Sequence, residues 1–186
     1  MDKNPDKIPE YNFTEMRDQM IKNNLNIVQF TDAFEKLNFL NRLISLTSMP
    51  VIFLDFDLLY SGYVVSRIIP ANEKIQIFRP TRDTIQAEFS NIVKMISCAR
   101  HIIVLDSLNG FYNIFDERVS GVLINRIAMF LEFISRNHDS TTIISAMVRK
   151  KENEWVLSPR CRQIIDVKNA QVFNPKNNDN ISSKIP

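Results

Sequence analysis

Glycine is scarce in this sequence: its 186 residues include only Gly62, Gly110 and Gly121. A phosphate-binding loop needs several glycines close together, because their small size lets backbone amides approach the ligand. The three glycines are too widely spaced for an intact G-x-x-x-x-G-K-[ST] loop, a G-x-G-x-x-G dinucleotide turn or a G-x-S-x-G nucleophile elbow. The sequence therefore argues against ordinary nucleotide-dependent chemistry.

Cysteine and histidine are also scarce, with two of each. They form no C-x-x-C or H-x-x-x-H pattern, so we expect no metal site and no cofactor. Two cysteines without a signal-peptide pattern predict free thiols and a cytoplasmic location. The apolar runs are too short to span a bilayer, so no membrane partner is expected. The net charge of +2 is compatible with a nucleic-acid partner but does not require one.

Hydrophobic periodicity divides the chain into three parts: a polar N-terminal segment over 1–30 with a short helix, a folded core over 31–173, and a disordered tail over 174–186. Helices are expected over 32–47, 64–69, 83–98 and 116–136, and strands over 51–54, 75–78, 101–106, 141–148, 162–168 and 171–173. Alternation of this kind predicts an α/β fold, with a mostly parallel sheet between two helical layers. The last two strands are expected to be antiparallel, as a hairpin.

Acidic residues follow two of the expected strands: Asp55 and Asp57 come after the first, and Asp106 comes after the third. Open α/β sheets bind ligands at the carboxyl ends of their strands, so these acids are the first candidates for a functional site. The structural alternative is that they cap loops and helix ends, as many acids do.

The residues 102–108, Ile-Ile-Val-Leu-Asp-Ser-Leu, resemble the Walker B strand of the RecA/RadA recombinase superfamily. A long helix over 116–136, the strand over 141–148 and the segment 155–167 then follow in the order found in that family. The resemblance covers residues 32–173 and looks like an archaeal RadA-like paralogue. It implies a RecA-like three-layer core in which Asp106 would support magnesium on a nucleotide.

The sequence departs from this family where nucleotide would bind. If 51–54 is the first core strand, the phosphate loop falls on 55–62, which reads Asp-Phe-Asp-Leu-Leu-Tyr-Ser-Gly and has no lysine. Its two acids add negative charge where a triphosphate needs amide donors and a cation. Met147 also replaces the family's polar sensor residue. We therefore expect a degenerate nucleotide site, formed by Asp55, Asp57, Ser61, Gly62 and Asp106.

These departures imply a non-hydrolysing paralogue without catalytic residues. Its expected role is that of an accessory or regulatory binding subunit, and its expected partner is a recombinase, a RecA-like ATPase subunit or a second copy of itself. A self-associating structural protein without a DNA role is an alternative from the same class.

An enzymatic alternative rests on residues 51–57, which resemble the opening motif of the haloacid dehalogenase phosphohydrolases. That resemblance implies a magnesium-dependent mechanism in which Asp55 is the nucleophile and Asp57 the general acid/base. Leu58 and Leu59 replace the Gly-Thr that normally follows the second acid.

Cations are concentrated between residues 148 and 168. They predict weak, sequence-independent DNA binding, whereas the alternative is a solvated hairpin. The expected nucleic-acid-binding residues are Arg149, Lys150, Lys151, Arg160 and Arg162. The apolar segment Phe111, Tyr112 and Phe115 is expected in a loop over 107–115, where it would stack on bases or cover the sheet edge.

Overall fold

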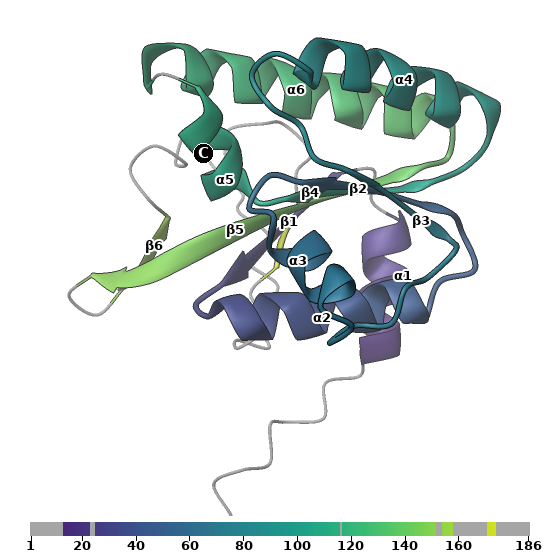
Figure 1. Ribbon diagram of the computed structural model, residues 1–186, viewed down its shortest axis with the longest axis horizontal. Coiled ribbons are helices and arrows are strands. Elements are labelled where there is room, and N and C mark those ends of the chain that lie inside the picture. Colours follow the sequence, from purple (N-terminus) through teal and green to yellow (C-terminus); the bar gives the residue numbers. More distant parts are fainter. Residues whose placement is uncertain (1–12, 23–24, 116, 152–153, 158–170, 174–186) are drawn as a thin grey trace, which may run out of the picture.

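The computed structural model of the chain describes residues 13–22, 25–115, 117–151, 154–157 and 171–173. The helices are α1 (Phe13–Lys22), α2 (Ala33–Ser45), α3 (Leu59–Val65), α4 (Ile85–Cys98), α5 (Leu108–Ile114) and α6 (Glu117–Asn137). The strands are β1 (Leu25–Phe30), β2 (Val51–Asp55), β3 (Ile75–Phe78), β4 (Ile102–Asp106), β5 (Thr141–Lys151), β6 (Glu154–Leu157) and β7 (Gln171–Phe173). A sheet lies between two helical layers (Figure 1), which confirms the predicted three-layer α/β core.

The strands of the sheet are arranged in the order β3-β2-β4-β5-β1-β7, and every neighbouring pair in this series is parallel. The interior strands β2 and β4 read Val-Ile-Phe-Leu-Asp and Ile-Ile-Val-Leu-Asp and are buried throughout. Continuous apolar runs are typical of parallel strands that are covered on both faces.

Successive residues of a strand pack alternately into two separate hydrophobic cores, one on each face of the sheet. Val51 and Phe53 of β2 pack with α1, α2 and α3, whereas Ile52 and Leu54 of the same strand pack with α4, α5 and α6. The period of two along a strand thus assigns each helix to one face of the sheet. No helix within the described ranges has the length and apolar character needed to cross a membrane.

The predicted boundary after residue 30 is wrong, because residues 25–30 form β1, which lies between β5 and β7 in the sheet. Two polar residues, Asn26 and Gln29, interrupt the apolar pattern of this strand. Asn26 is nevertheless fully buried, and its Nδ2 donates to the Met20 and Thr142 carbonyls at 2.9 and 3.3 Å. The helix before it, α1, packs on the same core through Phe13 and Met20.

The expected antiparallel hairpin of the C-terminal strands is not supported. β7 runs parallel to β1 in the sheet. The antiparallel partner that the structure does describe is β6, which pairs with β5 and was not expected as a strand. The strand predicted over 162–168 and the tail over 174–186 lie outside the described residues.

Two local predictions around helix ends have opposite outcomes. Asp32 is confirmed as the cap of α2, since its Oδ1 accepts from the backbone amides of Phe34 and Glu35 at 2.9 Å each. The loop expected over 107–115 is wrong, because Ser107 caps the short helix α5 by accepting from the Gly110 amide at 3.2 Å.

Candidate functional site at the carboxyl ends of the strands

The acids predicted at strand ends do meet at one edge of the sheet. Asp55 and Asp106 occupy paired register positions at the ends of β2 and β4, and both side chains are buried. The chain then crosses from β2 over the end of β4, since the Phe56 and Asp57 amides donate to the Asp106 carbonyl at 2.6 and 3.4 Å. The topology therefore brings all three predicted carboxylates to adjacent positions.

A lysine that the sequence analysis missed lies between two of these acids. Lys36 in the first turn of α2 places its Nζ 2.7 Å from Asp106 Oδ1 and 2.8 Å from Asp57 Oδ2. Its side chain is only 1% exposed. The hydroxyl of Ser145 on β5 also donates to Asp106 Oδ1. We call Lys36, Asp57, Asp106 and Ser145 the Lys36 cluster.

The charges of the Lys36 cluster depend on one another. Burial alone would lower the pKa of Lys36, but the charges of Asp106 and Asp57 outweigh burial and raise the pKa, which keeps the ammonium protonated. Burial raises the pKa of Asp106, although Lys36 and Ser145 oppose this by favouring the carboxylate. The stability of each charge therefore relies on partners supplied by the protein itself.

Asp55 belongs to a different set of contacts from Asp57. Its Oδ2 accepts from the Ser61 amide at 2.7 Å, whereas its Oδ1 is buried and has no hydrogen-bond partner among the described residues. The Tyr60 hydroxyl is likewise buried and has no partner in the described ranges. Burial, together with the charge of Asp55, raises the pKa of Tyr60 to about 12. Asp55 and Asp57 thus contact different groups, and the structure does not turn both carboxylates toward one phosphate.

The segment predicted as a phosphate loop, 55–62, is mostly not a loop. It enters α3 at Leu59, and Gly62 lies exposed within that helix, where an added Cβ would meet no atom within 4 Å. Gly110 of α5 has the opposite surroundings, because a Cβ there would lie 2.2 Å from Asp57 Oδ1 and 2.9 Å from the Phe56 carbonyl carbon. α5 therefore fills the space beside Asp57 that a ligand would need.

Carboxylates alone do not complete a metal site here. Within the part of the chain that the structure describes, no group of three or more His, Cys, Asp or Glu side chains is placed to hold a metal ion. In the Lys36 cluster, the ammonium of Lys36 occupies the position between the two carboxylates.

Three of the predicted nucleic-acid-binding residues, Arg149, Lys150 and Lys151, lie in β5. Arg149 is exposed, and positions 150 and 151 pair in register with Trp155 and Glu154. Successive strand positions alternate between faces, so 149, 150 and 151 do not all share one face. Arg160 and Arg162 lie outside the described residues. DNA binding by this segment stays a prediction.

The apolar segment after β4 is not available for base stacking. Phe111 and Tyr112 are buried in the core beneath α6, and the Phe111 ring packs 5.2 Å from Phe56 and 5.1 Å from Phe115. Of the alternatives for this segment, base stacking is wrong for Phe111 and Tyr112, because folding of 108–114 into a helix turns these rings inward.

Comparison with known proteins adds no assignment. No family model matches the sequence, and no curated protein matches it.

Proposed function

We propose that this chain is a non-hydrolysing RecA-like paralogue that acts by binding, as an accessory or regulatory subunit in the cytoplasm. The observation that supports it best is the Lys36 cluster. A P-loop consists of a strand, the segment G-x-x-x-x-G-K-[ST] and a helix, and its lysine reaches the β- and γ-phosphates of the nucleotide. β1 is followed directly by α2, and Lys36 lies at the sequence distance from the end of β1 that the lysine has in this motif, although α2 already begins at Ala33.

The other positions of such a loop do not suit a nucleotide. With Lys36 in the lysine position, Phe30 and Glu35 replace the two glycines and Leu37 replaces the Ser or Thr that binds magnesium. A phosphate also needs free amides at the start of the helix. Here the amides of Phe34 and Glu35 already donate to the Asp32 carboxylate.

Two kinds of group that bind phosphate in a P-loop, the first amides of the helix and the lysine, are therefore bonded to carboxylates of the protein here. Asp32 satisfies the amides of the first helical turn, while Asp57 and Asp106 bind the lysine. A triphosphate would have to displace three carboxylates and enter a space already bounded by α5. Both charge and sterics oppose nucleotide binding, which supports the non-hydrolysing part of the proposal.

The test is a titration of the purified chain with ATP and magnesium. We expect no thermal shift at millimolar ATP and no release of phosphate. A thermal shift that appears with ATP and disappears in Lys36→Met would show that the lysine reaches a nucleotide after all, and it would overturn the proposal.

The partner we propose is a recombinase or RecA-like ATPase subunit, or alternatively a second copy of the chain, and DNA is a further candidate. DNA binding is tested by replacing Arg149, Lys150 and Lys151 together with alanine. We expect weak, sequence-independent binding whose log-log salt slope falls by about 0.9 for each duplex phosphate that the variant no longer neutralises. Arg67→Ala, an exposed cation in the α1–α3 layer, serves as the control and should leave the slope unchanged. Unchanged binding in the triple variant would place any DNA surface elsewhere.

A further inference from the structure

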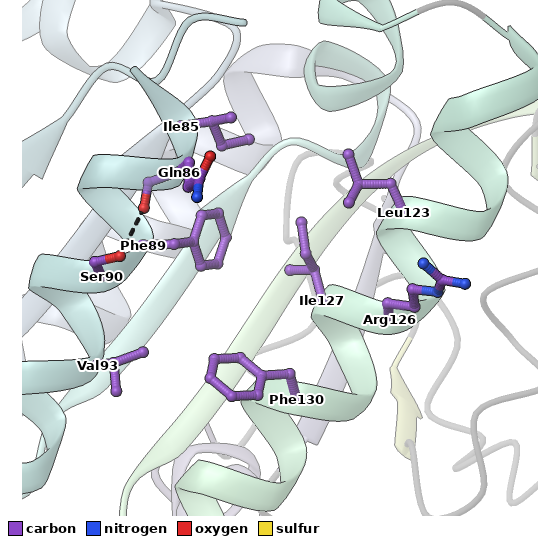
Figure 2. Close-up of a pocket in the computed structure, with 9 residues that line it drawn as sticks. All are labelled: Ile85, Gln86, Phe89, Ser90, Val93, Leu123, Arg126, Ile127 and Phe130. Carbon is purple, nitrogen blue, oxygen red and sulfur yellow. Dashed lines mark hydrogen bonds between the residues drawn. The ribbon is translucent and has the colours of Figure 1, made fainter. Parts of the chain in front are cut away.

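An open groove of about 630 Å³ lies between α4 and α6, on the outer side of one helical layer (Figure 2). Its lining is mainly apolar and comes from both helices: Ile85, Phe89 and Val93 from α4, and Leu123, Ile127 and Phe130 from α6. In Figure 2 the side chains of Phe89 and Ile127 point toward each other across the groove. A groove between two helices is the shape that receives a third helix.

The outer face of α6 extends this apolar surface beyond the groove. Val122, Met129 and Phe133 recur at helical spacing and are exposed, Met129 by 60% and Phe133 by 58%. The opposite side of α6 is buried in the core through Ile124 and Ala128. A helix that is apolar on both sides is normally covered on both sides, and a contiguous exposed apolar patch marks an interaction surface.

One charge lies within this surface. Arg126 lines the groove and is exposed, and it makes no hydrogen bond or ion pair with any residue that the structure describes. A purely apolar partner would bury this guanidinium without a counter-charge, which is costly. A two-fold copy of the chain, centred on the patch, would bring Arg126 close to Arg126 of the other copy, and like charges repel.

We propose that the α4–α6 groove binds an amphipathic helix of a partner protein, whose apolar side chains enter the groove and whose acidic side chain pairs with Arg126. α4 has 14 residues, which corresponds to a length of about 21 Å. The groove therefore suits a helix of about four turns. This surface lies on the other side of the sheet from α2, so the proposal does not depend on the state of the Lys36 cluster.

The test uses a displayed library of helical peptides of about 14 residues, selected on the wild-type chain and counter-selected on Arg126→Glu. Enriched peptides should carry apolar residues at i, i+3 or i+4, and i+7, with an Asp or Glu beside them. Arg126→Glu should weaken their binding at least tenfold, and replacing the peptide's acid by Lys should restore it. Phe133→Ser should also weaken it at least tenfold, and circular dichroism checks that this variant is folded.

The matched control is Arg67→Glu, the same charge reversal at an exposed residue in the α1–α3 layer, which should leave peptide affinity unchanged. The proposal is overturned if no peptide is enriched, or if enriched peptides lack an acid or bind Arg126→Glu equally well. Light scattering that shows a dimer dissociated by Phe133→Ser would assign the face to a second copy and would also overturn it. None of these results depends on whether the chain binds ATP.

Discussion

Replacing Lys36 by methionine tests whether the Lys36 cluster holds this edge of the sheet together by charge. Methionine keeps most of the buried stem of the lysine, so the main loss is the ammonium. Asp106 is then left buried with Ser145 as its remaining donor, while Asp57 loses its ion pair. Breaking a buried ion pair by removing one partner costs about 3–5 kcal/mol, and we expect Lys36→Met to lose that much at neutral pH.

The loss should depend on pH in a defined direction. Without Lys36, the pKa of Asp106 in the folded chain, which burial already raises, rises further above its unfolded value. An acid with a raised folded pKa binds a proton more readily when folded. The folded state of the variant is therefore favoured as pH falls, by up to about 1.4 kcal/mol per pH unit for one proton. The deficit relative to wild type should be smaller at about pH 5 than at about pH 7.5.

Urea denaturation followed by circular dichroism measures both quantities. Lys94→Met is the matched control, because Lys94 is exposed on α4 and its removal should change stability by no more than about 0.5 kcal/mol. The double variant Lys36→Met/Asp106→Asn should recover at least half of the loss, since the Asn oxygen still accepts from Ser145. A deficit below about 1 kcal/mol at neutral pH, where breaking a buried pair should cost several times that, would refute the reasoning. So would a deficit that does not narrow at low pH.

Three further substitutions test neighbouring features. Gly110→Ala should lose about 1–3 kcal/mol in thermal denaturation, because its Cβ would overlap Asp57 Oδ1. Gly62→Ala, which meets no atom within 4 Å, should be neutral or stabilising by up to about 1 kcal/mol, and equal effects of the two would contradict the packing argument. The pKa of Tyr60 is about 10 in the unfolded chain and about 12 in the folded chain. The neutral side chain therefore contributes up to about 2.7 kcal/mol of stability below pH 10, and this contribution is lost as pH rises to 12. When pH rises from 9 to 11, the free energy of unfolding should fall less in Tyr60→Phe than in wild type. An equal fall in both proteins would count against a raised pKa for Tyr60.

The fold could be predicted largely because β2 and β4 are unambiguous in the sequence. The runs at 51–54 and 102–105 are short, apolar and bounded by polar residues, and they form the strands at the predicted positions. The order of alternating helices and strands then leaves few topologies other than a parallel sheet between helical layers. β1 was not predicted because Asn26 and Gln29 interrupt its apolar run. Asn26 can be buried because its side chain donates hydrogen bonds to the Met20 and Thr142 carbonyls, contacts that the sequence does not show.

The candidate site could be predicted only in part. Its acids were visible, because each lies at or just after the end of a strand, but the helical periodicity of 33–45 gives no reason to expect that Lys36 is buried. Its burial depends on Asp57 and Asp106, which reach it only after β2 and β4 have paired. Missing β1 also hid the distance from the end of that strand to Lys36, on which the proposed correspondence to a P-loop rests.

The way in which the polar groups of this edge are satisfied bears on where a partner could bind. A ligand site commonly leaves donors or acceptors that its ligand completes, because buried polar groups need partners. In the Lys36 cluster, Lys36 is bonded to Asp57 and Asp106, and Asp106 also accepts from Ser145, while the first amides of α2 are bonded to Asp32. The exceptions at this edge are Asp55 Oδ1 and the Tyr60 hydroxyl, which are buried without a partner among the described residues. A ligand would gain little by replacing the bonds of the cluster, because the buried charges that it displaced would be left without their partners, which is costly. The incomplete surface is instead the α4–α6 layer, where exposed apolar side chains surround a cation without a partner among the described residues, and this is where we expect the chain to bind.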